Sequence, residues 1–436
     1  MKNTLNTAVP VDPSGILEKP TNFRWVLVGV TFLLLLVAYF DRINIGVCGP
    51  MIMKEFDITK VQLGMAMSAF FVAYVIMQIP GGMLSQKYGI RLVGTIAIVF
   101  WSVFTFLTPL AWGFVSLVAI RFLFGLGEGP LMPNSATFIA RWINKKEKGL
   151  ASGISMLSGA FLGSVIAPPL AVWILTVWNW HAVFYIYGAG GVLVGVLWYA
   201  LARDYPHIHP SVNKAELAII TGESLDKIKE TPKPEPAPWK KFLCSGQFWA
   251  VGLQIFSVSY IMYLFLSWLP IYLLEARGLN LKAMGFAVSY PWLAIFITVI
   301  LGGKISDALL AKGYSKFIAR SLPAIIGLAV SGVSFYAAGN VTSADESILW
   351  LTVSLGALGF TYTSGYTSCQ DLGGKFGGTV VSWMQTWSNI GGILAPIITP
   401  MLVKVFGWQQ SLLITSFVVI LGFVLWFFVK PDKALV

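Results

Sequence analysis

Residues 25–47 read WVLVGVTFLLLLVAYFDRINIGV, an apolar run in which only Asp41 and Arg42 are charged. A helix needs about 20 predominantly apolar residues to cross a hydrocarbon core of about 30 Å. Runs of this kind recur along the whole chain, and we expect twelve of them, separated by polar breaks. The sequence therefore predicts an all-α integral membrane protein with twelve transmembrane helices. We place the spans at about 25–47, 61–84, 92–112, 114–140, 149–176, 182–202, 247–275, 283–303, 319–339, 348–370, 378–404 and 409–430.

The composition excludes a soluble protein. Of the 436 residues, 56% are hydrophobic and 11% are charged, whereas soluble domains carry roughly 25% charged residues. The net charge of +11 does not indicate nucleic acid, because that needs a basic patch on a soluble domain and the soluble stretches here are short. Three scattered cysteines, Cys48, Cys244 and Cys369, predict neither a disulfide framework nor a metal site. We expect no cofactor.

The chain divides into two similar halves. Gly82-Met-Leu-Ser-Gln after the second span recurs as Gly303-Lys-Ile-Ser-Asp after the eighth, and Gly163-Ser-Val-Ile-Ala-Pro in the fifth recurs as Gly392-Ile-Leu-Ala-Pro in the eleventh. Between the sixth and seventh spans lies a charged, proline-rich segment, KIKETPKPEPAPWKK, which is typical of linkers. We therefore predict five regions: a cytoplasmic tail (1–24), an N-terminal six-helix bundle (25–202), a cytoplasmic linker (203–246), a C-terminal six-helix bundle (247–430) and a second tail (431–436).

The basic residues predict how the chain crosses the membrane. Most of the 30 Lys and Arg residues fall in segments on the same side as both termini. Cytoplasmic loops of membrane proteins carry an excess of Lys and Arg. We expect a multi-pass protein with both termini in the cytoplasm.

Four charges lie well inside the predicted spans, away from their ends: Asp41 and Arg42 in the first, and Arg121 and Glu128 in the fourth. A charge at the bilayer centre costs at least about 2.5–3.5 kcal/mol, so such residues are functional candidates. Arg121 and Glu128 are two helical turns apart and share a face, whereas the adjacent Asp41 and Arg42 point in different directions. We expect Asp41 to face Arg121 and Arg42 to face the centre of the protein. The alternative is that these charges form buried ion pairs that only hold the first and fourth helices together.

Several stretches resemble the major facilitator superfamily and, within it, the anion:cation symporters. The loop GGMLSQKYGIRL is similar to the superfamily's cytoplasmic signature, although Gln86 replaces the usual acid; the second copy keeps an acid as Asp307. The stretches YFDRINIG, YVIMQIPGG, RFLFGLGEGP and SNIGGILAP carry the resemblance to the symporters.

The resemblance implies two pseudo-symmetric six-helix bundles and a transporter of organic anions with protons or sodium. It further implies Asp41 and Glu128 as proton-coupling sites, Arg42 as the ligand of the substrate carboxylate and Arg121 as the charge partner of Asp41. Asp307 is expected to act as a conformational latch on the cytoplasmic face. By the same resemblance, the protein is a monomer in the inner membrane of a bacterium.

Other polar and aromatic side chains in the spans are candidates for substrate binding. Amides and phenols hydrogen-bond hydroxyl and carboxylate groups, and aromatic rings stack on sugars or aromatic substrates. For each, the alternative is packing or polar contact between helices. In addition to Arg42, the candidates for substrate binding are Tyr39, Tyr74, Gln78, Tyr366, Trp383 and Asn389.

These observations predict a secondary active transporter that imports an organic carboxylate by proton symport with alternating access. The sequence favours a sugar acid, such as an aldonate, aldarate or hexuronate. An aromatic or small hydroxy carboxylate (phthalate, hydroxyphenylacetate or tartrate) and sodium coupling stay open as alternatives. An enzyme is disfavoured, because the spans contain no clustered catalytic set and the chain no nucleotide-binding P-loop; we assign no catalytic residue. The expected partners are the organic anion, protons and the lipid bilayer, with no nucleic acid.

Overall fold

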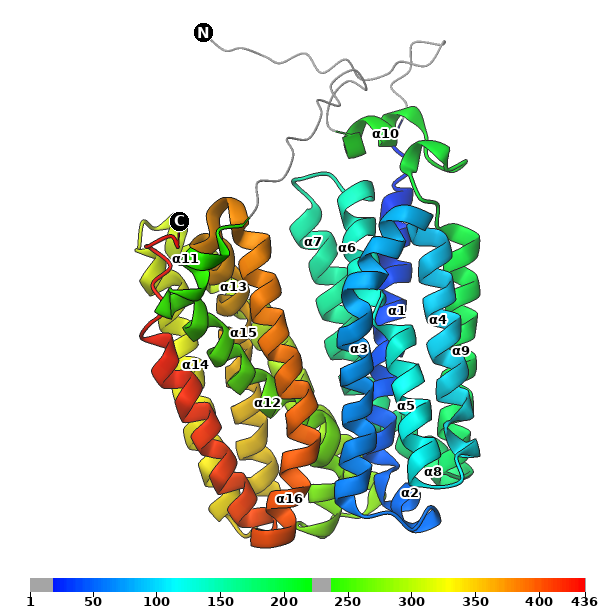
Figure 1. Ribbon diagram of the computed structural model, residues 1–436, viewed down its shortest axis with the longest axis vertical. Helices are drawn as coiled ribbons and strands as arrows, with labels where there is room; N and C mark the ends of the chain where they lie inside the picture. The colour runs from blue at the N-terminus through cyan, green and yellow to red at the C-terminus, as the bar shows by residue number, and fades with distance from the viewer. Residues whose placement is uncertain (1–18, 222–236, 436) are drawn as a thin grey trace.

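The computed structural model describes residues 19–221 and 237–435, and within these ranges the chain forms helices and no strand. The helices gather into two bundles that stand side by side (Figure 1). Parts of the predicted N-terminal tail and of the predicted linker lie outside the described residues.

The first bundle contains the helices before the linker. They are α1 (Phe23–Val47), α2 (Gly49–Glu55), α3 (Lys60–Tyr88), α4 (Ile90–Leu107), α5 (Phe114–Glu128), α6 (Leu131–Trp142), α7 (Lys148–Ser152), α8 (Gly159–Val177) and α9 (Trp180–Leu201). A 3-10 turn (Thr108–Leu110) extends α4, and a π-helical segment (Gly153–Ser158) joins α7 to α8.

The second bundle contains the helices after the linker. They are α12 (Gly246–Glu275), α13 (Leu281–Ala311), α14 (Leu322–Asn340), α15 (Ala344–Gly373) and α16 (Gly377–Trp426). A π-helical segment (Phe317–Ser321) precedes α14, and a 3-10 turn (Gly374–Phe376) separates α15 from α16. The linker contributes the 3-10 turn Pro206–Ile208 and the helices α10 (Lys214–Thr221) and α11 (Trp239–Leu243).

The helix lengths agree with the predicted fold class. In the described residues, ten helical stretches are long and apolar enough to cross a membrane. One of them, α16, is two helices joined at Gly407, where φ is 76°; glycine adopts this left-handed conformation without the penalty of a Cβ. With α16 divided there and α15 added, the described chain has twelve long helical segments. The prediction of an all-α membrane protein of two bundles is confirmed.

The internal repeat is visible in how the helices begin and pack. Thr59 caps α3 by accepting a hydrogen bond from the backbone N–H of Gln62, and Asn280 caps α13, the equivalent helix of the second half, by accepting one from that of Ala283. In the first bundle, the indole of Trp180 donates to Glu55 at 2.7 Å. In the second, the indole of Trp408 donates to Glu275 at 3.0 Å. The same Trp–Glu bond therefore ties the last long helix of each half to a glutamate that lies shortly before the second long helix, α3 or α13.

The two bundles contact each other at the end of the molecule where α2 lies, which we call the α2 end (Figure 1). There Lys60, at the start of α3, pairs with Glu275, at the end of α12, at 2.6 Å. Ser289 on α13 donates to the carbonyl of Val165 on α8 at 2.6 Å. We call the opposite end, where α10 and α11 lie, the α10 end; in Figure 1 the two bundles are splayed apart there.

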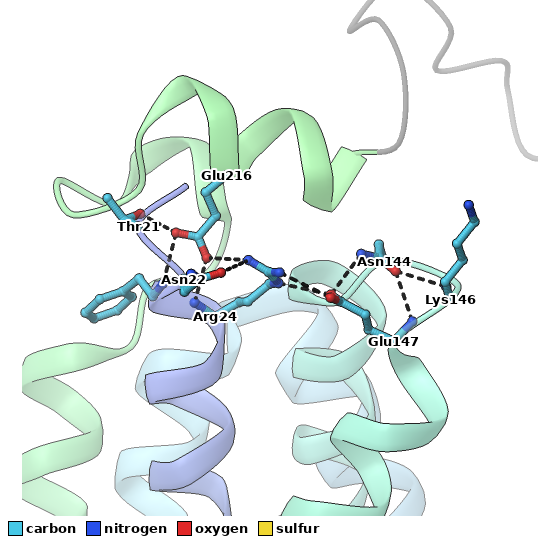
Figure 2. A network of polar contacts seen from close by, with 8 residues as sticks. Thr21, Asn22, Arg24, Asn144, Lys146, Glu147 and Glu216 are labelled. Carbon is cyan, nitrogen blue, oxygen red and sulfur yellow. Dashed lines mark hydrogen bonds and ion pairs between the residues drawn. The ribbon is translucent and has the colours of Figure 1, made fainter. Parts of the chain in front are cut away.

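Helix α10 is docked on the first bundle by a buried ionic network (Figure 2). Glu216 on α10 accepts hydrogen bonds from the hydroxyl of Thr21, the backbone N–H groups of Phe23 and Arg24, and the Arg24 guanidinium. Arg24 also binds both oxygens of Glu147, just before α7, at 3.0 and 3.2 Å. The carboxylate of Glu216 thus satisfies the free N–H groups at the start of α1 and joins three segments at the α10 end.

Candidate functional site

The shortest ion pair inside the bundles joins Arg42 of α1 to Glu128 of α5. The guanidinium Nε and Nη2 both contact Oε1 of Glu128, at 2.7 and 2.5 Å. Both side chains are buried. A charge-assisted contact of this length is strong. It uses Nε and Nη2 of the guanidinium, so the third nitrogen, Nη1, takes no part in the pair.

Asp41 and Arg121 lie beside this pair without forming a second one. The Asp41 carboxylate is placed toward the indole N–H of Trp101 and the hydroxyl of Thr105 rather than in an ion pair. Among the described residues, Nε and Nη1 of Arg121 have no hydrogen-bond partner. Arg121 instead stacks on Phe124, one turn along α5, with its guanidinium carbon 4.4 Å from the ring centroid. The two residues interact electrostatically across the helices.

The sequence predicted that Asp41 faces Arg121 and that Arg42 faces the centre of the protein. It did not predict the direct ion pair that the structure shows, which joins Arg42 to Glu128. Two turns separate Arg121 from Glu128 on α5, and the structure places the acid of the two, Glu128, against Arg42. The four charges form one cluster that is neutral when all are ionised.

Glycines place α5 close enough for this contact. A Cβ at Gly125 would lie 2.3 Å from the carbonyl oxygen of Phe70 on α3, and one at Gly127 would lie 2.8 Å from the backbone nitrogen of Trp101 on α4. Small residues allow such close approach between membrane helices. Pro130 follows, so α5 ends at Glu128 and α6 begins at Leu131. The carboxylate therefore sits at a helix break.

Aromatic rings surround the Arg42 guanidinium. Its central carbon lies 4.9 Å from the ring centroids of both Tyr39 and Tyr74, and 5.1 Å from that of Phe70. Cation–π contacts of this kind are worth about 2 kcal/mol when they are desolvated. The rings hold the guanidinium in place while leaving its hydrogen-bond donors for anions. The structure brings the predicted candidates Tyr39 and Tyr74 to Arg42.

Gln78 and Asn389 meet across the two bundles. The amide of Asn389 on α16 donates to Oε1 of Gln78 on α3 at 3.3 Å. Next to Asn389, Ser388 shares a hydrogen bond of 2.6 Å with Ser259 on α12. These polar groups lie at the interface of the halves and already bond one another.

Two further aromatic candidates differ in what they contact. Tyr366 on α15 shares a 3.4 Å hydrogen bond with Tyr362, one turn earlier. Trp383 on α16 is packed within the second bundle: its indole donates to the carbonyl of Phe248 at 2.9 Å and its ring stacks on the Phe248 ring, with centroids 4.7 Å apart. Trp383 therefore has the contacts of a packing residue.

The predicted latch residue Asp307 lies at the α10 end of the second bundle. Its nearest basic group is Arg320, at 3.8 Å, and its side chain is 78% exposed. Asp371 holds the basic residues more tightly, contacting Lys316 at 2.9 Å and Arg320 at 3.3 Å. The functional roles assigned to Asp307 and to the other site residues stay predictions.

Sequence reasoning missed Tyr263 on α12 and Tyr362 on α15. Tyr263 packs against Phe71 of the first bundle, with ring centroids 4.5 Å apart, and interacts electrostatically with Arg42. Tyr362 packs against Phe161, also of the first bundle, with centroids 6.2 Å apart. Their only sequence signal is the four-residue spacing of Tyr362 from Tyr366, which is equally typical of packing.

Known transporters resemble this chain over nearly its whole length. A probable galactarate/D-glucarate transporter of Bacillus subtilis, GudP, is 34% identical, and the match covers 91% of this chain and 89% of that protein. A D-galactonate transporter of Escherichia coli is 31% identical, with 93% and 95% covered. A probable sulfoacetate transporter of Cupriavidus necator, SauU, is 32% identical, with 87% of each covered.

A solved structure has the same fold. It is a bacterial homologue of the human lysosomal transporter Spinster, with a TM-score of 0.77 at 18% identity; the match covers 94% of this chain and 98% of that one. The family profile described as Major Facilitator Superfamily matches residues 31–394 and 308–435. Together with the relatives at 30% identity and above, this match shows that the chain belongs to the Major Facilitator Superfamily, a family of transporters, as its motifs led us to expect.

Proposed function

We propose that this protein imports an organic carboxylate together with protons by alternating access. The substrate class that we propose is the sugar acids, because relatives that are 30–34% identical are named as galactarate, glucarate and galactonate transporters. The relatives are organic-anion transporters; the coupling ion and the transport cycle are our proposal.

The observation that carries the proposal is the Arg42–Glu128 pair. It is buried in the aromatic surround of Tyr39, Tyr74 and Phe70. Buried ion pairs seldom improve stability over apolar packing, and a charge within the membrane region is a functional candidate. Because the Arg42 guanidinium already binds the carboxylate of Glu128, it can bind the carboxylate of a substrate in the same way.

Exchange of carboxylates on Arg42 links the substrate to the proton. A substrate carboxylate that binds Arg42 displaces Glu128, which then lies buried without its cation. Burial without a cation favours the neutral form of a carboxyl group, so Glu128 takes up a proton. Substrate and proton cross together, and release of the substrate returns Arg42 to Glu128 and frees the proton. Asp41, buried beside Arg121, is a second proton site in this scheme.

The contacts between the bundles suggest which side of the cycle the structure represents. The halves are held together at the α2 end by Lys60–Glu275 and Ser289–Val165. We infer that the α10 end faces the cytoplasm, because the basic residues concentrate there. The conformation is then closed to the outside. We place the protein as a monomer in the bacterial inner membrane with both termini cytoplasmic.

Internal acidification of proteoliposomes tests the proposal. The purified protein is reconstituted with a pH-sensitive dye inside and an inward proton gradient, and galactarate, glucarate and galactonate are added one at a time, followed by tartrate and phthalate. Acidification on adding a sugar acid is the expected result. Uptake of a labelled sugar acid that needs sodium and brings no proton would contradict proton coupling. No uptake of any acid under either gradient would contradict the proposed substrate class.

A further inference from the structure

Three tyrosines of the second bundle lie at or near its contact with the first: Tyr263 on α12, and Tyr362 and Tyr366 on α15. We call them the tyrosine wall. Tyr263 packs against Phe71, whose ring lies 4.7 Å from that of Phe70, and Phe70 in turn lies 5.1 Å from the Arg42 guanidinium. Tyr362 packs against the first bundle, and Tyr366 lies one turn along α15 from it. The wall therefore lies across the interface from the rings that surround Arg42, on the other half of the protein.

The wall belongs to the interface between the bundles. The rings of Tyr263 and Tyr362 pack against Phe71 and Phe161 of the first bundle. All three tyrosines nevertheless keep partial solvent exposure. Side chains that contact both halves and are still partly exposed line the space between the halves.

The phenols offer hydrogen-bonding capacity that the neighbouring polar groups do not. Gln78 is bonded to Asn389, and Ser259 to Ser388. Tyr362 and Tyr366 share only one long hydrogen bond, of 3.4 Å, between their hydroxyls. A phenol both donates and accepts, so this pair can bond an inserted hydroxyl group more favourably than it bonds itself.

We propose that the tyrosine wall forms the second half of the substrate site and recognises the hydroxyl groups of a sugar acid whose carboxylate is bound by Arg42. The inference rests on the proposed function and deepens it, because it assigns the hydroxyl-recognising residues. The substrate then bridges the bundles, with its charge on α1 and its hydroxyl groups on α12 and α15. Binding thereby favours the approach of the halves that transport requires.

A comparison of two diacids of equal chain length tests the wall. Galactarate carries hydroxyl groups along its carbon chain, and adipate carries none. The half-saturating concentration of labelled galactarate and the inhibition constant of adipate against it are measured in proteoliposomes for the wild type, Tyr263→Phe, Tyr362→Phe and Tyr366→Phe. Tyr290→Phe is the matched control, because Tyr290 is exposed on the surface of α13.

Each wall variant loses one hydroxyl and keeps its ring. We expect the half-saturating concentration of galactarate to rise about two- to tenfold, as loss of one neutral hydrogen bond predicts. The adipate constant should stay unchanged, and Tyr290→Phe should match the wild type for both acids. Equal weakening of both acids would show a packing role and overturn the proposal, as would no change in either.

Other outcomes separate the wall from the proposed function. Galactarate uptake that is independent of protons would remove the coupling, while the galactarate and adipate comparison would still decide the role of the wall. Uptake of aromatic acids alone, unaffected by the phenylalanine substitutions, would overturn recognition of hydroxyl groups and leave proton symport intact. A wild type that takes up no acid would overturn both.

Discussion

Glu128 is the residue whose loss should separate binding from coupling. In Glu128→Gln the amide keeps the shape of the side chain but cannot carry the proton, so downhill exchange of substrate should persist and proton-driven accumulation should fall to background. Counterflow and uphill uptake of a labelled sugar acid, measured on the same vesicles, check this. Glu346→Gln, at an exposed acid on α15, is the control. Uphill uptake at the wild-type level would remove Glu128 from the coupling.

Arg42 tests the geometry of the anion site. Lysine preserves the charge but not the planar fork that contacts Glu128 through two nitrogens. Hydrogen bonds to charged groups contribute about 1.5–3 kcal/mol, so Arg42→Lys should raise the half-saturating concentration of the substrate about tenfold or more. Saturation curves in proteoliposomes measure it. An unchanged value would place the carboxylate on another cation.

Among the structural elements, α3 and α12 form the contact most directly involved in opening at the α2 end. Lys60 and Glu275 are 35% and 33% exposed, and exposed pairs contribute about 1 kcal/mol or less. Glu275→Gln should therefore shift the ratio of the two conformations by no more than about fivefold, toward opening at the α2 end. Distances between spin labels placed on the two bundles at this end report the shift.

A charge exchange separates the ion pair from local effects of each substitution. Lys60→Glu combined with Glu275→Lys should restore the wild-type distance distribution, whereas either single change should not. Trp408 must be considered in this comparison, because its indole also bonds Glu275. Wild-type distances in both single variants would show that apolar packing alone closes the α2 end.

Helix α10 should be held on the first bundle in a pH-dependent way. Burial of Glu216 favours its neutral form, but its hydrogen bonds from Thr21, the backbone of Arg24 and Phe23, and the Arg24 guanidinium outweigh this effect and hold its pKa below the ordinary value of 4.5. A carboxyl group whose pKa is lower in the folded state stabilises the fold at pH above its unfolded pKa, and the stabilisation is lost as pH falls through the folded pKa. The network is therefore fully formed at neutral pH.

Removal of Arg24, the cation that pairs with Glu216, should destabilise the folded protein. Arg24→Ala leaves Glu216 buried without its cation, and breaking a buried pair costs about 3–5 kcal/mol. The melting temperature in detergent should fall at pH 7, and the difference from wild type should shrink as pH drops from the ordinary pKa of 4.5 through the lower pKa that Glu216 has in the folded protein. Lys145→Ala, an exposed cation nearby, should melt like the wild type. A difference that is constant with pH would exclude the charge of Glu216 as its cause.

At the scale of the whole molecule, the sequence predicted the fold and the charged cluster but not the contacts within the cluster. Span length and apolar composition are local properties, so the bundles could be predicted, and Asp41, Arg42, Arg121 and Glu128 stood out because charges are rare in spans. Which charges pair depends on helix rotation and tilt, which no local pattern encodes. Tyr263 was missed for a related reason, since a tyrosine in an apolar helix has the same pattern whether it packs or binds.

Labelling of the native cysteines can test the orientation of the protein in the membrane. Cys244, beside α11 at the α10 end, is exposed, whereas Cys48 and Cys369 are buried. If the α10 end is cytoplasmic, a membrane-impermeant maleimide should label inside-out vesicles and leave intact spheroplasts unlabelled. Lys54→Cys in a Cys244→Ser background moves the exposed thiol to α2 at the opposite end, and its labelling should be reversed. Labelling of the native protein in intact spheroplasts would invert the topology. The α2 end would then face the cytoplasm, and the conformation closed at that end would be open to the outside.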